Sequence, residues 1–253
     1  MILAIVQARM SSQRLPGKVM KEILGRPLIT YTLERLRAAR QIDKIILATS
    51  DDKTNDPLCR CVEGLGYAVF RGSEDDVVDR FYQAAKKFQA THVVRITGDC
   101  PLLDPFIIDQ VVDVFQKQNA DLVLTGPKFA EGVDCEIFSA KALERAWREA
   151  NRKSEREHVT QYFLNHPELF KSLKLENSTD DSRYRFVCDE PEDFKVVAAV
   201  LEAFAQESRQ DFSVGRVKKF LDSHPGIFQL NAHVVRNAGL KKSLQEDGLF
   251  RHG

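Results

Sequence analysis

Three cationic side chains follow the first apolar segment of the chain, and no acid lies among them. After residues 2–6 (ILAIV), the chain carries Arg9, Arg14 and Lys18, and its first acid is Glu22. Guanidinium and ammonium groups are common protein ligands of phosphate oxygens. The pattern therefore predicts a site for an anion with several charges, such as a triphosphate chain. A solvated basic turn is the alternative.

The other residues of this loop favour binding. Ser11 and Ser12 supply hydroxyl groups, and Gly17 allows the backbone to approach an anion closely. The loop is not a Walker A motif, because Val19 follows Gly17-Lys18 and no glycine stands at position 12. It also lacks the glycine fingerprint of dinucleotide-binding folds.

Two aspartates end later apolar segments. Asp99 ends residues 92–99 and Asp189 ends residues 183–189, so both are candidates to face a ligand. An aspartate in such a place is also common in turns and at helix N-caps. Asp189 or Asp193 could therefore cap the helix expected after residue 190 instead.

Apolar segments and segments of helical periodicity alternate through the first half of the chain. Strands are expected at residues 2–6, 44–50, 67–70, 92–99 and 121–125, and helices at 27–40, 56–66, 75–88 and 104–118. The alternation predicts an α/β fold with an open, mostly parallel, Rossmann-like sheet and helices on both faces. Ligands of such sheets bind outside the carboxyl ends of the strands. In the second half, strands are expected at 135–139, 173–177 and 183–189, and helices at 190–206 and 213–225.

The chain shows no repeats and no Gly/Ser-rich linker. We therefore expect one domain over residues 1–230, with a smaller inserted arm at about 130–180. The segment 231–253 is polar and is expected to form a C-terminal tail.

The composition excludes some classes of partner. Lys+Arg and Asp+Glu both number 37, and this balance disfavours nucleic acid. No segment approaches the roughly 18 apolar residues of a membrane helix, and the N-terminus lacks the features of a signal peptide. Five scattered cysteines indicate reduced thiols and a cytoplasmic location. Cys59 and Cys61 are expected to pack on a helix and not to bind zinc.

Seven motifs resemble those of the cytidylyltransferases. They are QARMSSQRLPGK, KVMKEILGRPLI, IILATSDD, VFRGSEDDVVDRF, VVRITGDCPLLDP, EREHVTQY and VCDEPEDF. Their joint spacing, over residues 1 to about 205, resembles the spore coat polysaccharide biosynthesis protein F family, which is similar to CMP-KDO synthetases and acylneuraminate cytidylyltransferases. The resemblance implies a nucleotide-diphospho-sugar transferase type of fold. It also implies transfer of CMP from CTP to a sugar or sugar acid, with release of pyrophosphate, for surface or spore coat polysaccharide synthesis.

The resemblance implies a magnesium ion held by Asp99 and Asp189 beside the triphosphate, and Mg²⁺ commonly takes one or two carboxylates plus phosphates. Arg9, Arg14 and Lys18 would act in catalysis by holding the triphosphate, with Lys18 meeting the charge on the leaving pyrophosphate. The residues expected to bind the nucleotide are Gln7, Ala8, Arg9, Ser11, Ser12, Gly17, Lys18, Thr49, Ser50, Arg71, Thr97 and Gly98.

Some of these expectations have alternatives. Thr49 and Ser50 could bond the base or form an ordinary polar strand end. Arg71 could approach the base or ribose, or pair with a neighbouring acid. Arg95 lies inside an expected strand, where an unpaired charge is costly, so it should pair with an acid such as Asp79 or reach the site.

The acceptor is expected to contact the second half of the chain, where related enzymes carry sugar specificity and a dimer arm. The candidates are Asp134, Glu136, Arg156 and His158. Arg156 could bind an acceptor carboxylate through two hydrogen bonds. His158 could act as a base or form a structural hydrogen bond. The arm implies a homodimer.

Two other functions compete with this one. Asp99-Cys100-Pro101 offers one acid where sugar transferases use an Asp-x-Asp pair, which weighs against a glycosyltransferase with a nucleotide-sugar donor. The second alternative is a non-catalytic nucleotide-binding subunit, which would bind nucleotide without releasing pyrophosphate.

Overall fold

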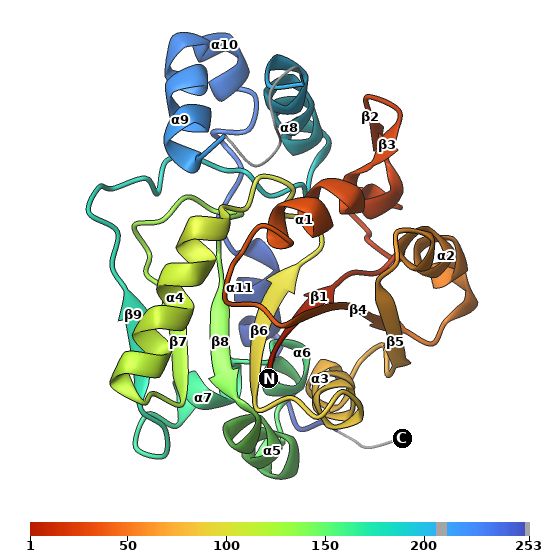
Figure 1. The fold of residues 1–253 in the computed structure, drawn as a ribbon, viewed down its shortest axis with the longest axis vertical. Helices are drawn as coiled ribbons and strands as arrows, with labels where there is room; N and C mark the ends of the chain where they lie inside the picture. Colours follow the sequence, from red (N-terminus) through yellow and green to blue (C-terminus); the bar gives the residue numbers. More distant parts are fainter. Residues whose placement is uncertain (206–211, 251–253) are drawn as a thin grey trace.

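The centre of the molecule is a seven-stranded sheet of order β5-β4-β1-β6-β8-β7-β9 (Figure 1). The computed structural model describes residues 1–205 and 212–250. The strands are β1 Ile2–Gln7, β4 Lys44–Ser50, β5 Ala68–Gly72, β6 His92–Thr97, β7 Leu122–Thr125, β8 Glu136–Ser139 and β9 Ser172–Leu175. Strand β8 is antiparallel to β6 and β7, and the other pairs are parallel. The predicted mostly parallel α/β sheet is confirmed.

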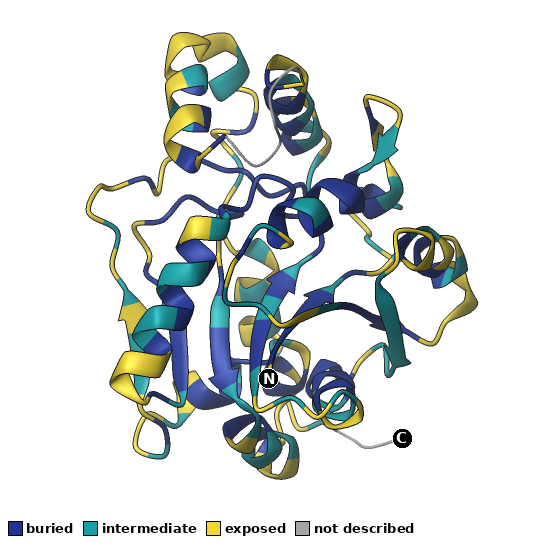
Figure 2. Cartoon of the chain, viewed as in Figure 1, coloured by how far each residue is buried: buried dark blue, intermediate teal, exposed yellow. Residues whose placement is uncertain are grey.

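Helices cover both faces of this sheet. They are α1 Leu28–Leu36, α2 Asp56–Gly64, α3 Val77–Lys87, α4 Pro105–Gln118, α5 Ala140–Glu149 and α7 Gln161–Asn165. Ala4 and Val6 of β1 belong to one hydrophobic core with α1, α2 and α4. Leu3 and Ile5 belong to another with α3, α5 and α7. The central strands are therefore buried on both sides, as Figure 2 shows, which explains their continuous apolar sequences.

Further short elements complete the chain. They are η1 Lys18–Met20, β2 Glu22–Ile23, β3 Arg26–Pro27, η2 Lys53–Asn55, α6 Lys153–Glu157, α8 Pro191–Ala203, α9 Val214–Ser223, α10 Pro225–Phe228 and α11 Ala238–Gln245. A third hydrophobic cluster joins the start of α1 to α8 and α9, and these helices lie beyond the carboxyl end of β6 (Figure 1).

The prediction of a strand at residues 183–189 is wrong. The segment is extended but forms only an isolated bridge, from Arg185 to Glu131. Its alternate side chains Tyr184, Phe186 and Cys188 are buried in the third cluster. The alternation of apolar residues in this segment therefore reflects the burial of every second side chain against helices. It does not reflect pairing of the segment within a sheet.

The second half of the chain adds strands to the central sheet, and its C-terminal part packs against earlier elements. Strands β8 and β9 belong to the same sheet as β1. Beyond residue 230, Asn231 is buried and α11 packs against α6. No helix in the described ranges, 1–205 and 212–250, is long and apolar enough to cross a membrane.

Candidate active site

A cavity of about 790 Å³ opens beside the carboxyl ends of β1 and β6. One side is formed by the loop that follows β1, including Arg9, Arg14 and Lys18. Thr97 and Asp99 line it at the end of β6, and Asp189, Glu157 and α11 complete the wall. Its position is that of ligand sites in open α/β sheets.

The ammonium group of Lys18 lies between two carboxylates. Lys18 begins η1, and its side chain is only 11% exposed. Its Nζ donates hydrogen bonds to Oδ2 of Asp99 and, at 2.5 Å, to Oδ1 of Asp189. Burial by itself would lower the pKa of Lys18, but the two negative charges outweigh this effect and the pKa is raised. Lys18 is therefore firmly charged.

Backbone contacts bring the two aspartates together although 90 positions separate them. The N–H of Cys188 donates to the carbonyl of Asp99 at 2.8 Å, so the segment that carries Asp189 lies against the end of β6. Burial by itself would raise the pKa of Asp189, but Lys18, Arg14 and Arg185 lower it. The carboxylate is held in its charged form at neutral pH.

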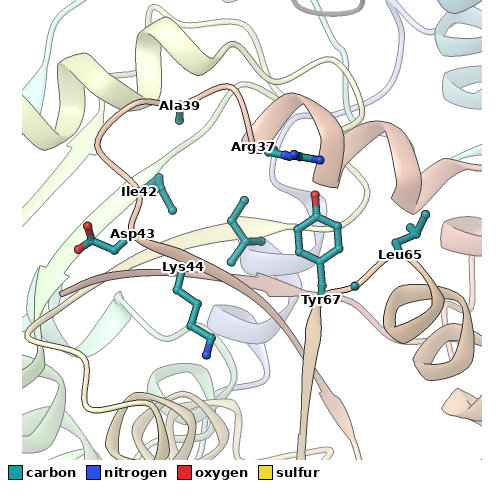
Figure 3. Close-up of a pocket in the computed structure, with 9 residues that line it drawn as sticks. Arg37, Ala39, Ile42, Asp43, Lys44, Leu65 and Tyr67 are labelled. Atoms are coloured by element: carbon teal, nitrogen blue, oxygen red, sulfur yellow. The ribbon is translucent and has the colours of Figure 1, made fainter.

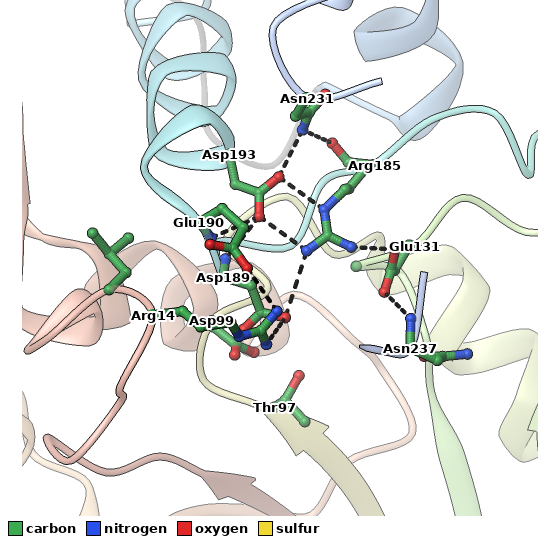
Figure 4. A network of polar contacts seen from close by, with 12 residues as sticks. Arg14, Thr97, Asp99, Glu131, Arg185, Asp189, Glu190, Asp193, Asn231 and Asn237 are labelled. Atoms are coloured by element: carbon green, nitrogen blue, oxygen red, sulfur yellow. Dashed lines mark hydrogen bonds and ion pairs between the residues drawn. The ribbon is translucent and has the colours of Figure 1, made fainter. Parts of the chain in front are cut away.

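A buried network around Arg185 holds the start of α8 and also reaches the carboxylate of Asp189, which Arg185 approaches to 3.5 Å (Figure 4). Asp193 accepts hydrogen bonds from the N–H groups of Asp189 and Glu190, at 3.0 and 2.9 Å, at the start of α8. Arg185 donates to both carboxylate oxygens of Asp193, at 2.8 and 3.0 Å, and also to Glu131. Asp193 therefore serves the helix end, and the expectation that Asp189 might do so is wrong.

The other loop cations also have acidic partners. Arg14 forms ion pairs at 2.9 Å with both Asp189 and Glu190. Arg9 pairs at 2.9 Å with Glu74, which also accepts a hydrogen bond from Ser11 at 2.7 Å. These acids come from segments more than 60 positions away in the chain. The positive charges of the loop therefore have no acidic neighbours in the sequence, but they have acidic partners in the folded protein.

The two glycines of the expected nucleotide site have different structural roles. Gly17 has a φ of 64°, a left-handed conformation that shapes the turn before η1. A Cβ at Gly98 would lie 2.7 Å from the Cβ of Ala8 and 2.9 Å from Ile29. Gly98 is therefore needed where β6 packs against α1 and the start of the loop.

The residues expected at the base do not line this cavity. Thr49 and Ser50 are fully buried at the end of β4, and Asn55 donates to the Ser50 hydroxyl at 2.7 Å. Arg71 pairs with Asp56 at 2.6 Å and donates to the carbonyl of Asp52 at 2.7 Å. The structure does not bring these residues to Lys18. Of the rest, Gln7, Ala8, Ser11, Ser12 and Thr97 line the cavity.

The four acceptor candidates also lie outside the cavity lining. Asp134 pairs with Arg236 at 3.0 Å. Glu136 pairs with Arg95 at 2.8 Å and accepts a hydrogen bond from Thr160. Asp79, the expected partner of Arg95, instead accepts from Trp147 at 2.8 Å. Of the 156–158 segment, only Glu157 lines the cavity, and burial lowers the pKa of His158.

Arg156 lies in a buried environment, where its side chain contacts other groups of the protein. Its side chain is 3% exposed, pairs with Asp76 at 3.3 Å and donates to the carbonyls of Ala150 and Trp147. We expect Arg156→Met to lower the free energy of unfolding by about 3–5 kcal/mol, because Asp76 is left as an unpaired buried charge. Urea denaturation measures the change.

The control for this substitution is Arg148→Met, which removes an ion pair from an arginine that is 65% exposed. We expect it to change the free energy of unfolding by less than about 0.5 kcal/mol. A stable Arg156→Met protein that had lost only acceptor affinity would contradict the structural role.

Several cavity residues were missed by the sequence interpretation. Glu74 was considered only as an acid near Arg71, and Lys242, Ser243 and Glu246 lay in the segment expected as a tail. Glu157 was grouped with Arg156 and His158 in the region expected at the acceptor, and it does line the cavity. The available signal was the spacing of Leu240 and Leu244, which is helical. That pattern indicates a helix but not the surface it packs on.

A second cavity, of about 320 Å³, lies before the start of β4 and β5 (Figure 3). Arg37, Asp43, Lys44 and Tyr67 are among its lining residues. Lys44 begins β4, so this cavity is at the amino end of the sheet. Because ligands of open α/β sheets bind at the carboxyl ends, we assign the active site to the larger cavity.

The sheet order and the cation-rich loop at the carboxyl end of β1 define a nucleotide-binding α/β protein of the nucleotidyltransferase type. The chain belongs to the cytidylyltransferase family, whose family model matches residues 3–236. The resemblance expected from the motifs is confirmed.

The chain is also similar to individual proteins over most of its length. The chain is 38% identical to the uncharacterized protein MJ1063 of Methanocaldococcus jannaschii, over 92% of this chain and 95% of the relative. It is 33% identical to the spore coat polysaccharide biosynthesis protein SpsF of Bacillus subtilis, over 88% and 95%. A cytidylyltransferase structure from Leptospira borgpetersenii superposes with a TM-score of 0.85 at 32% identity, covering 90% of this chain and 96% of the other.

Proposed function

We propose that this cytidylyltransferase-family protein transfers CMP from CTP to a sugar or sugar acid, with release of pyrophosphate. The observation that carries the proposal is the convergence of Lys18, Asp99 and Asp189 at one point of the large cavity. In the reaction, an acceptor hydroxyl oxygen forms a bond to the α-phosphorus. The bond from that phosphorus to the bridging oxygen breaks, pyrophosphate leaves, and the hydroxyl proton passes to solvent.

The loop residues have separate tasks in this proposal. Arg9 and Arg14 lie at the cavity surface and would exchange their pairing with Glu74 and Asp189 for contacts with phosphate oxygens. Lys18 would meet the charge that builds on the leaving pyrophosphate. Such transfer depends chiefly on positioning and on charge stabilisation.

The site fits a magnesium ion in its donor chemistry. The carboxylates of Asp99 and Asp189 face one position, which the Lys18 ammonium occupies as a stand-in cation. Among the described residues no group of three or more His, Cys, Asp and Glu side chains could hold a metal. Phosphate oxygens and water would therefore supply the other ligands. Magnesium, when bound, would polarise the α-phosphate and favour deprotonation of the attacking hydroxyl.

The test is a nucleotide panel with pyrophosphate detection, crossed with octulosonic and nonulosonic acids as acceptors. We expect CTP with Mg²⁺ to support release of pyrophosphate and to stabilise the fold by about 2.7 kcal/mol at a hundred times its Kd. Greater stabilisation by UDP- or GDP-sugars would favour a glycosyltransferase. CTP binding without pyrophosphate release would favour a non-catalytic subunit.

We also propose that the protein acts in the cytoplasm as a homodimer that supplies polysaccharide synthesis. The spore coat relative from Bacillus subtilis supports the last part by its name. Light scattering of the purified protein tests the dimer directly.

A further inference from the structure

We propose that α11 is the acceptor-binding wall of the cavity and that Lys242 binds the carboxylate of a sugar acid. This inference rests on the proposed function and deepens it. It assigns acceptor recognition to a C-terminal helix, whereas the sequence motifs directed it to Asp134, Glu136, Arg156 and His158.

The cavity has two chemically different sides. The loop after β1 and the two aspartates form the side suited to the triphosphate. Another part of the lining consists of Glu157 and five residues of α11 and its end: Ala238, Gly239, Lys242, Ser243 and Glu246. A cavity of about 790 Å³ lies in the upper part of the usual range for ligand sites, so a second small molecule has room beside the nucleotide.

Lys242 differs from the other cations of the cavity in its pairing. Arg9, Arg14 and Lys18 each form an ion pair with an acid. Within the described part of the chain, the side chain of Lys242 has no such partner and is exposed to the cavity. A carboxylate bound there would be neutralised without breaking an existing pair.

The neighbours of Lys242 suit a polyhydroxylated molecule. Glu157 and Glu246 present carboxylate oxygens, which accept hydrogen bonds from sugar hydroxyl groups. Ser243 donates to Glu157 at 2.8 Å and orients it. Two carboxylates repel a doubly charged phosphate group more strongly than a singly charged carboxylate, and a single ammonium neutralises only one charge, so the site favours a sugar acid over a sugar phosphate.

The helix is held in place at both ends. Before α11, the N–H of Asn237 donates to Glu131 at 3.1 Å, and Glu131 also binds Arg185 of the network around Asp189 (Figure 4). After it, the N–H of Ser154 donates to Asp247 at 3.1 Å. A wall fixed in this way loses little freedom when a ligand binds.

The experiment compares Lys242→Met, Lys242→Arg and the matched control Lys241→Met, which changes the neighbouring exposed lysine outside the cavity lining. Pyrophosphate release with CTP is measured against 3-deoxy-manno-octulosonate, N-acetylneuraminate and neutral hexoses. We expect Lys242→Met to raise the KM for the sugar acid roughly ten- to hundredfold, the range for a lost charged hydrogen bond. The KM for CTP and kcat should change less than about twofold, and Lys242→Arg should restore most of the affinity.

Three results would overturn the inference. The first is an unchanged KM for the sugar acid in Lys242→Met, and the second is an equal rise of that KM in Lys241→Met. The third is a wild-type protein that turns over the neutral hexoses, or that turns over none of the acceptors. Calorimetric titration with CTP separates this failure from that of the proposed function. If the wild-type protein binds CTP and releases pyrophosphate while Lys242→Met behaves normally, only the acceptor wall is refuted.

Discussion

Replacing Lys18 with methionine is expected to lower the rate of pyrophosphate release from CTP by about a hundred- to thousandfold. This is the range observed when an enzyme loses one donor aimed at charge that develops in the transition state. Lys18 is nearly buried and contacts both Asp99 and Asp189, so no other group of the loop can take its position. Steady-state pyrophosphate detection at saturating CTP measures the change.

The matched control for this prediction is Lys21→Met. Lys21 lies just after η1, is exposed and does not line the cavity. We expect its loss to leave the rate within about twofold, because an exposed charge outside the cavity lining is screened by salt. Circular dichroism establishes that both variants remain folded. A folded Lys18→Met enzyme with the rate of the wild type would remove Lys18 from the mechanism.

Manganese binding should depend on CTP and on the two aspartates. The Lys18 ammonium lies between the two carboxylates, and Arg14 and Arg185 face Asp189, so a divalent cation that entered alone would meet repulsion. The triphosphate offers Lys18 and Arg14 other partners. Electron paramagnetic resonance of free Mn²⁺ should therefore show weak binding without CTP and at least about tenfold tighter binding with it.

Asp189→Asn is expected to lower the affinity for Mn²⁺ in the presence of CTP by at least about tenfold, because one of two anionic oxygen ligands is lost. Asp99→Asn should act similarly. Asp113→Asn is the control, since Asp113 lies on α4 outside the cavity lining, where it pairs with Lys117 at 3.5 Å and accepts a hydrogen bond from Gln41 at 2.7 Å, which an asparagine oxygen can also accept. Equal Mn²⁺ affinity in the presence and absence of CTP, or in wild type and Asp189→Asn, would disprove the assigned site.

Much of the catalytic half of the cavity followed from local sequence patterns. Apolar segments marked the strands; the loop that carries Lys18 follows one of them, and Asp99 comes at the end of another. Because the carboxyl ends of parallel strands meet at one edge of a sheet, their proximity was predictable. Asp189 was harder, because its segment is not a strand, and tertiary contacts such as the hydrogen bond from the N–H of Cys188 to the carbonyl of Asp99 place it.

The pairing of charges was not predictable in the same way. From the sequence, Arg9 had no acidic partner, but the fold places Glu74 beside it. Arg156 was expected to be available to an acceptor carboxylate, but the fold buries it against Asp76. Coulomb energy depends on distance in space, and these partners are 65 and 80 positions apart in the chain. A pattern of sequence neighbours contains no information about such distances.

The amino-acid order alone therefore determined the family, the alternation of strands and helices, and the cationic loop at a strand end, because these depend on motifs and on local periodicity. Tertiary packing alone decided which acids neutralise the loop, which aspartate serves the start of α8, and that α11 forms the second wall of the cavity. Each of those outcomes depends on contacts between segments that only the folded chain brings within hydrogen-bonding distance.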